Sequence, residues 1–310
     1  MSAALATVST ATSDLAAFIG REGRLPCLGD AVPPWEYRGW NLPYLHGLHA
    51  AGLCGNRWGY LLDILETRKL PADPIPQVRF GERDMSVMKS LDEWARMIGF
   101  DLGGWSDFNR LIEWLGWSLG LTDEPPRLSA AVNEKLYRAV NLGPMVQTPY
   151  DYLGSWVSDR KASGWNPTAF YPTPHAVCEC MVQMTFHDAK AEDGRDPRTL
   201  SVCDPCVGSG RMLLHAANFS LNLYGADIDP MICLVCKING ALYAPWIVRP
   251  IPAEILGTPD ATELPAEHIG LVDPLPQQRA LFDKGEPKPR KKRGRTTRRP
   301  AASSNRGDDR

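Results

Sequence analysis

The stretch LSVCDPCVGSGRMLLHAANFSLNLYGADIDPMICLVCKINGALY, residues 200–243, decides the fold of this chain of 310 residues. The apolar run that ends at Cys203 predicts a short buried strand, and the Gly-rich residues 204–210 predict a turn. An apolar-periodic helix is expected over 211–221, a second strand with its end over 223–230, and another helix after it. Strand, turn, helix, strand and helix make a βαβ unit, so we expect parallel strands joined by a right-handed crossover.

The turn and the end of the second strand have a chemical consequence. Glycines let the backbone approach a ligand closely, and the following helix offers free N–H groups at its start. Asp227 ends the second strand 23 residues after Asp204, where its carboxylate can accept hydrogen bonds from both hydroxyls of a ribose. The spacing therefore predicts an adenosine-containing ligand at the carboxyl ends of the strands. The alternative is a βαβ unit whose turn is merely tight.

This turn differs from two other nucleotide-binding loops. It is not the G-x-G-x-x-G expected around a pyrophosphate, and it lacks the Gly-Lys-Ser/Thr of a loop that grips phosphates. The sequence therefore disfavours a nicotinamide cofactor and ATP.

Two motifs of this unit resemble those of N6-adenine DNA methyltransferases. DPCVGSG at 204–210 resembles the first S-adenosylmethionine motif of that family, and YGADIDP at 224–230 resembles the second. The resemblance implies an α/β fold with a partial Rossmann-like, S-adenosylmethionine-dependent methyltransferase domain over 148–272. It also implies S-adenosyl-L-methionine as cofactor, DNA as partner, and methyl transfer to adenine N6.

Two upstream segments extend the resemblance. FYPTP at 170–174, followed by Val177, Met181 and Val182, resembles the Thr-Pro motif that these enzymes place before the first strand. DYLG at 151–154, with a tryptophan two residues later, resembles the approach segment of the methylation subunit of type I restriction-modification systems.

Carried over by position, the motifs imply which residues hold the methionine end of the cofactor. Thr173 would hold its carboxylate. Asp204, together with the backbone from Gly208 to Gly210, would hold its amino group.

The same resemblance implies residues for the adenosine end. Asp227 would bind the ribose hydroxyls, and Ile228 would pack on the adenine ring. Asp260 resembles the third-strand acid that accepts a hydrogen bond from the adenine amino group. For each acid the alternative is a cap or turn carboxylate.

One part of the family pattern is missing. The family grips the target base with Asn/Asp/Ser-Pro-Pro followed by an aromatic residue, and no such tetrad occurs downstream. DPLP at 273–276 keeps an acid and a proline, which makes Asp273 the candidate catalytic residue. VPPW at 32–35 has the prolines and the aromatic ring, but Val32 cannot accept a hydrogen bond, and we interpret this stretch as a Pro-rich loop.

The alternative function follows from that gap. Few residues separate Asp260 from the basic tail, so we expect the cofactor half of a methyltransferase without a full base-binding half. The chain would then be an adenine-specific DNA methylase, or a catalytically silent module that binds S-adenosylmethionine or DNA. A partner subunit would supply specificity or the missing catalytic half. A truncated remnant is a third reading.

Charge is distributed unevenly along the chain. The formal net charge is −2, yet residues 284–310 hold 11 Lys/Arg against three acids. Such a tail, poor in apolar residues, is expected to be disordered. It either solubilises the chain or contacts a phosphate backbone. No apolar run approaches the roughly 18 residues of a membrane span, and the start lacks a basic signal region, so we expect a cytoplasmic protein.

The first half differs in character. We expect a flexible start over 1–24 and a mainly helical, Trp-rich region over 25–147. Nine of the ten tryptophans lie between residues 35 and 165, and we expect them to form the core. Ser129 is expected to cap a helix. Thr148-Pro149 is expected to start the helix that carries Tyr152.

The eight cysteines are expected to be reduced thiols. Cys203 and Cys206, with Cys233 and Cys236, form a C-x2-C…C-x2-C pattern that suits zinc. Their position in the βαβ unit favours small buried hydrophobic residues instead. A second open alternative for metal binding has non-standard spacing and consists of Cys27, His46, His49 and Cys54.

Overall fold

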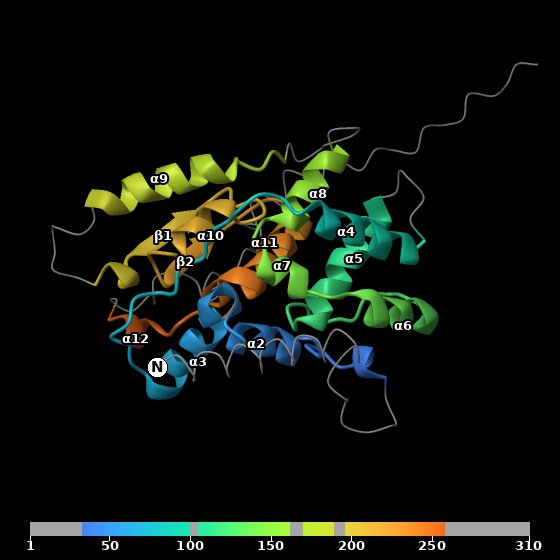
Figure 1. Cartoon of the computed structure of the whole chain (residues 1–310), viewed down its shortest axis with the longest axis horizontal. Coiled ribbons are helices and arrows are strands. Elements are labelled where there is room, and N and C mark those ends of the chain that lie inside the picture. Colours follow the sequence, from blue (N-terminus) through green and yellow to red (C-terminus); the bar gives the residue numbers. More distant parts are fainter. Residues whose placement is uncertain (1–32, 100–104, 162–169, 189–195, 258–310) are drawn as a thin grey trace, which may run out of the picture. The chain divides into compact units, whose positions relative to one another are not determined.

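Two short strands, β1 (Ser201–Asp204) and β2 (Asn222–Gly225), pair in parallel. Ser201 lies opposite Asn222 at one end, and Asp204 lies opposite Gly225 at the other. Helix α10 (Arg211–Ala216) connects them, and α11 (Pro230–Tyr243) follows (Figure 1). The predicted parallel βαβ arrangement is confirmed.

The computed structural model describes residues 33–99, 105–161, 170–188 and 196–257, all within one compact unit. The other elements before β1 are η1 (Pro34–Glu36), α2 (Leu42–Ala50), η2 (Leu53–Asn56), α3 (Arg57–Thr67), α4 (Met85–Met97), α5 (Trp105–Ser118), α6 (Ala130–Ala139), α7 (Gly143–Gln147), α8 (Tyr152–Lys161), α9 (His175–Asp188) and η3 (Pro197–Thr199). After α11 come η4 (Pro245–Ile247) and α12 (Ala253–Leu256). The fold is thus mixed α/β, with a small parallel sheet and many helices.

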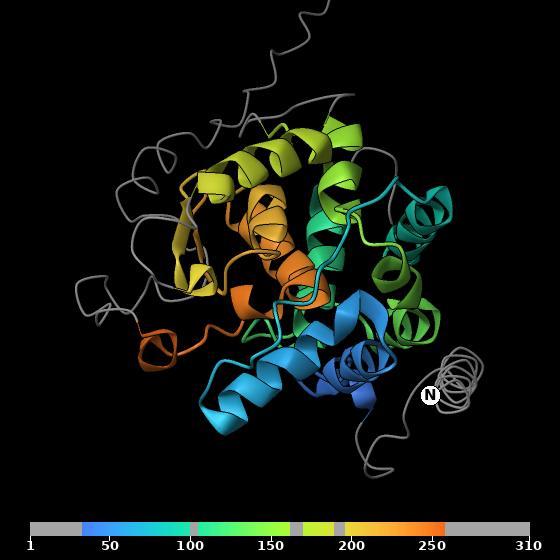
Figure 2. The same ribbon diagram turned by 60° about the vertical axis from the view of Figure 1, so that its left-hand side comes forward.

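Helix α11 is the central element of the core. It is buried from Ile232 to Tyr243 except at Lys237, as expected for a helix that is apolar on all sides. It packs against α5, α7, α8 and α10. Figure 2 shows α11, in orange, running through the middle of the described elements. Buried residues from both halves of the sequence belong to one continuous apolar cluster.

The last turn of α11 is hydrogen-bonded by side chains from α2 and α3. Trp58 Nε1 donates to the carbonyl of Ala241 at 2.8 Å, and His49 Nε2 lies 3.1 Å from the carbonyl of Leu242. Arg57 Nη1 donates to the carbonyl of Tyr243 at 2.9 Å. These carbonyls have no partner within the helix, so α2 and α3 supply the hydrogen-bond donors that the end of α11 lacks.

Arg57 is a fully buried cation among neutral acceptors. Besides the Tyr243 carbonyl it donates to the carbonyls of Pro76 and Ala217, and to the side chain of Asn218. Its guanidinium carbon lies 5.1 Å from the centre of the Trp246 ring. Burial lowers the pKa of Arg57 to about 9. Carbonyls at the ends of two helices compensate the charge, as the helix dipole favours.

Helix α10 ends earlier than the sequence predicts. It stops at Ala216, and the expected helix over 211–221 is therefore wrong in extent. The Asn218 side chain exchanges two hydrogen bonds of 2.9 Å with the backbone of Val78. This long-range contact holds a turn that brings the chain into β2.

Two predictions for the helical first half of the chain are confirmed, one for a helix cap and one for the tryptophan core. Ser129 caps α6, with its hydroxyl accepting from the Val132 N–H, as predicted. The predicted tryptophan core is confirmed at positions that are at most 8% exposed, namely Trp58, Trp94, Trp114, Trp117 and Trp156.

The predicted start of α8 is wrong. Thr148 ends α7, and its hydroxyl donates to the carbonyl of Pro144 at 2.8 Å. The helix begins at Tyr152, and the Asp151 carboxylate accepts from the Gly154 N–H at 2.8 Å, which is the position of an N-cap.

The cysteine prediction is right for one pair and wrong for the other. Cys233 and Cys236 are buried on α11, where burial raises the pKa of Cys233 to about 12. Cys203 and Cys206 are exposed, because β1 has a neighbour on one side only in the described sheet and Cys206 lies in the following loop. Nowhere in the described segments do three His, Cys, Asp or Glu side chains gather as metal ligands would.

Several expectations fall on residues that the structure does not describe. They are the flexible start over 1–24, Cys27, and the basic tail over 284–310. In the described part of the chain, no helix has the length and apolar character needed to cross a bilayer.

We predict that Arg57→Met lowers the free energy of unfolding by more than about 2 kcal/mol, because it leaves several buried carbonyls without a donor. Urea denaturation followed by tryptophan fluorescence measures this. Arg68→Met is the control: that side chain is 61% exposed and pairs with Glu254, so the change is within about 0.5 kcal/mol. Equal effects of the two variants would contradict the role of Arg57.

Candidate cofactor site at the ends of the parallel strands

The Gly-rich loop and the end of β2 lie directly against each other. Val207 N–H donates to the carbonyl of Ala226 at 2.9 Å. The next N–H, that of Gly208, donates to Oδ2 of Asp227 at 2.9 Å. The spacing of the two motifs therefore corresponds to a real junction at the carboxyl ends of both strands.

Two glycines allow the loop its conformation. Gly208 has φ +55° and Gly210 has φ +91°, in the left-handed region that other residues rarely adopt. A Cβ atom on Gly210 would lie 2.7 Å from the sulfur of Cys236. The loop thus needs glycine both for its backbone and for its packing on α11.

The two candidate acids are half-buried at the strand ends. Oδ1 of Asp204 accepts from the N–H of Cys206 at 3.1 Å, and Oδ1 of Asp227 accepts from the N–H of Asp229 at 3.0 Å. Burial raises the pKa of Asp204, and the nearby Asp227 raises it further. Asp229 caps α11 through the N–H groups of Met231 and Ile232. Asp229 therefore serves the helix, whereas Asp204 and Asp227 border the junction.

The segment 170–174 lies beside the same loop. A Cβ atom on Gly208 would lie 3.1 Å from the ring of Phe170, so that ring is close to the loop backbone. The side chain of Thr173 is exposed, and its carbonyl accepts from Nη1 of Arg211 at 3.0 Å. Arg211, the first residue of α10, thus connects the Thr-Pro segment to the end of the loop.

The structure brings some predicted site residues together and leaves others untested. Asp204, Gly208 and Asp227 meet at the junction, and Gly210 ends the loop. Ile228 is half-buried directly after Asp227. Asp260 and Asp273 lie outside the described residues, so their placement stays a prediction.

Asp151 is the residue that the sequence analysis missed. Its side chain is fully buried, and each carboxylate oxygen accepts two hydrogen bonds. Oδ1 accepts from the Gly154 N–H at 2.8 Å and from Nδ2 of Asn239 at 2.7 Å. Oδ2 accepts from Oγ of Ser209 at 2.5 Å and from Nε of Arg211 at 2.7 Å. The carboxylate thereby connects the start of α8 with the loop, α10 and α11.

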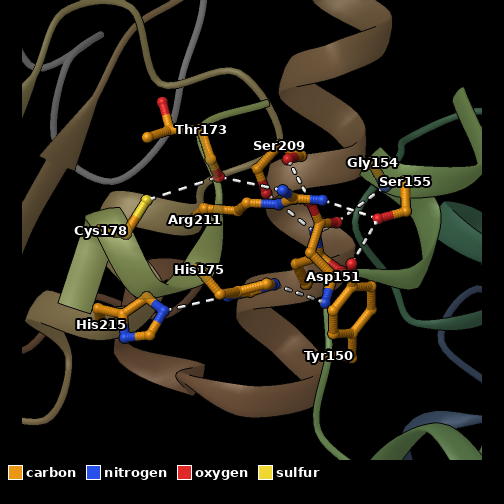
Figure 3. A network of polar contacts seen from close by, with 11 residues as sticks. Tyr150, Asp151, Gly154, Ser155, Thr173, His175, Cys178, Ser209, Arg211 and His215 are labelled. Carbon is orange, nitrogen blue, oxygen red and sulfur yellow. Dashed lines mark hydrogen bonds and ion pairs between the residues drawn. The ribbon is translucent and has the colours of Figure 1, made fainter. Parts of the chain in front are cut away.

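Figure 3 shows Arg211 lying between Asp151 and Thr173. Its Nη2 atom also donates to Oγ of Ser155 at 2.7 Å, and its side chain is 8% exposed. Because the charge is paired and its N–H groups have acceptors, burial of this cation is tolerated. In the sequence, the only signal was that Arg211 is a charged residue at the start of an otherwise apolar helix pattern. That signal did not reveal Asp151 as its partner.

The network around Asp151 leaves no room for a side chain at Gly154. A Cβ atom there would lie 2.2 Å from Oδ2 of Asp151 and 2.5 Å from Oγ of Ser209. The glycine of the DYLG motif thus leaves room for the buried carboxylate and the loop serine.

Two histidines extend the network on its other side. The Asp151 N–H donates to Nε2 of His175 at 3.3 Å, and Nδ1 of His175 lies 3.0 Å from Nε2 of His215. Phe80 stacks on His175 with ring centres 5.3 Å apart. Burial, and after it the charge of Arg211, lowers the pKa of His175 to about 4. An Nε2 atom that accepts a hydrogen bond carries no proton, which agrees with a neutral ring.

A hollow of about 270 Å³ lies between α9 and β1, next to Asp204. Apolar side chains form most of its wall, among them Met181, Val182 and Phe186 from α9. Met181 and Val182 therefore line this hollow rather than the junction of loop and Asp227.

The donors and acceptors at the junction suit S-adenosyl-L-methionine. Two half-buried carboxylates fit an ammonium group and a pair of ribose hydroxyls. The Gly-rich backbone leaves no side chain at positions 208 and 210. The residues present therefore fit the cofactor that the motifs imply.

Residues 150–244 match the family model described as N-6 DNA Methylase. The predicted resemblance to N6-adenine DNA methyltransferases is thereby confirmed for this segment. A search of curated proteins found no match.

One solved structure similar to this chain is the type I restriction-modification system methyltransferase subunit from Streptococcus thermophilus. The identity is 13% and the TM-score is 0.30. The similarity covers 89% of this chain, which spans about 59% of the length of that subunit.

We predict that the free energy of unfolding decreases as the pH falls from 6.5 towards about 4, because the unfolded state binds protons that the neutral His175 of the folded state does not. Stability from this histidine is present above pH 6.5 and is lost below it. His175→Phe keeps a ring on Phe80 and should make the dependence shallower. Denaturation at several pH values tests this; exposed His187, changed to Gln, is the control. An unchanged slope in His175→Phe would disprove the assignment.

Proposed function

We propose that this chain binds S-adenosyl-L-methionine at the carboxyl ends of β1 and β2 and takes part in methyl transfer to adenine N6 in DNA. The observation that carries the proposal is the hydrogen bond of 2.9 Å between the Gly208 N–H and the Asp227 carboxylate. It joins two cofactor motifs inside a segment that matches the N-6 DNA Methylase model. The wider domain would be Rossmann-like.

At the methionine end, the exposed Thr173 hydroxyl would hold the carboxylate. Asp204 and the loop backbone from Gly208 to Gly210 would hold the amino group. Burial and the nearby Asp227 raise the pKa of Asp204, and no cation of the described residues pairs with this acid, so the ammonium group of a ligand would stabilise its charged form.

At the adenosine end, Asp227 would accept from the ribose hydroxyls, and Ile228 would pack on the adenine ring. Each oxygen of Asp227 already accepts one backbone N–H and has a lone pair left for a hydroxyl. Asp260 would accept from the amino group of the cofactor. When bound, the cofactor supplies a methyl group on a sulfonium, which an amine can attack directly.

On the substrate side, Asp273 would accept a hydrogen bond from the amino group of the target adenine. The basic residues of 284–310 would contact the DNA backbone. Both assignments concern residues outside those that the structure describes. A partner subunit would supply sequence specificity.

The second candidate function is a catalytically silent module that binds S-adenosylmethionine or DNA and completes its site with a partner chain. The sequence supports it at one point: DPLP at 273–276 has Leu275 where the family has proline, and no aromatic residue follows. Without that aromatic ring, no side chain of the motif could stack on an extruded base.

We predict that isothermal titration calorimetry detects S-adenosylmethionine binding and that Asp227→Ala weakens it by about 10- to 100-fold, the loss of one or two hydrogen bonds to a charged group. Glu254→Ala is the control, because this acid is exposed and pairs with Arg68 away from the junction. Absence of binding heat from the folded wild-type chain would remove the proposal.

Methyl incorporation separates the enzyme from the silent module. With tritiated S-adenosylmethionine and unmodified DNA, the full chain should transfer label to adenine, and Asp273→Ala should reduce the rate at least about 100-fold if this acid holds the target amine. Cofactor binding with no transfer, alone and with a candidate partner subunit added, would favour the silent module.

A further inference from the structure

The loop over 205–210 is held from two sides. On the strand side its N–H groups reach Ala226 and Asp227, where the cofactor is proposed to bind. On the opposite side the Ser209 hydroxyl donates to Asp151 at 2.5 Å. Ser209 is 2% exposed and Asp151 is 0% exposed, so this second attachment is out of reach of a ligand.

We propose that Asp151 is a positioning residue for the cofactor. Through Ser209 it holds the backbone of Gly208 and Gly210 in the conformation that faces Asp227. The inference rests on the proposed function, because it concerns the same cofactor site.

Conformational entropy is the physical reason. The loop contains two glycines with positive φ, and glycine has the largest freedom to lose when a loop becomes ordered. Residues 207, 208 and 209 are each tied to a different acceptor before any ligand arrives. A loop already ordered reduces the entropic cost of binding, which raises affinity.

The surroundings of Asp151 are arranged for this contact. Asn239 Nδ2 donates both to Asp151 at 2.7 Å and to the Ser209 carbonyl at 2.9 Å. These two contacts turn the Nδ2 atom towards the loop and the carboxylate, while Oδ1 is buried with no hydrogen-bond partner in the described part of the chain. The loop serine is therefore held through both its side chain and its backbone.

The network offers a matched pair of variants. Ser209→Ala and Ser155→Ala each remove one buried hydroxyl within hydrogen-bond distance of the Asp151–Arg211 pair. Ser209 belongs to the loop, whereas the described contacts of the Ser155 hydroxyl are with Arg211 and Tyr150. Neither variant leaves a buried charge without its counter-ion, so both are expected to fold.

Calorimetry on the full chain should show that Ser209→Ala weakens S-adenosylmethionine binding about tenfold, and that Ser155→Ala changes it less than about twofold. Both should lower the melting temperature by a similar few degrees. Hydrogen exchange of the ligand-free chain should be faster over 205–210 in Ser209→Ala alone.

Equal dissociation constants for the two variants, with the wild type binding normally and Asp227→Ala binding weakly, would overturn the positioning role and leave the proposed function intact. If the wild type itself gave no binding, the proposed function would fail instead. Faster exchange over 205–210 in both variants would also overturn the inference, because the effect would then be general loosening.

Discussion

The fold depends on satisfying the carboxyl end of α11 inside the core. A helix buried on all sides leaves its last carbonyls away from water, and each would cost free energy without a donor. Trp58, His49 and Arg57 provide those donors from α2 and α3. Helices α2 and α3 are therefore part of the same core as the βαβ unit.

The same helix supports the candidate site through its middle. Asn239 on α11 donates to Asp151 and to the Ser209 carbonyl. Arg211 continues the chain of contacts to the carbonyl of Thr173. The Gly-rich loop is thus held between the strand ends and a buried polar network, and its position follows from contacts among segments that are far apart in sequence. Because the network is buried, loss of one of these contacts would leave a donor or acceptor without a partner away from water.

Two observations support the proposed cofactor site. The match to the N-6 DNA Methylase model covers the motifs, and the structure joins these motifs in space. The acids at the junction are half-buried, which strengthens their interaction with a charged or hydroxyl-bearing ligand relative to an exposed surface. The groups proposed for the target base lie beyond this junction in the sequence. The cofactor half is therefore the part of the proposal with structural support.

The sequence by itself determined what local chemistry controls. Apolar period placed α11, Ser129 marked the start of α6, and the two motifs indicated a parallel unit with acids at the strand ends. These features depend on a few neighbouring residues, so their signal is present in one stretch of chain.

Only the tertiary structure decided the features that depend on distant partners. The role of Asp151 required Ser209, Arg211 and Asn239, which come from three later segments. Helix α10 ends just before Asn218, which bonds to the distant Val78, and Cys203 is exposed because β1 pairs on one side only in the sheet of the described residues. In each case the outcome depends on which distant segments lie beside the residue, and no local pattern encodes which partner will be there.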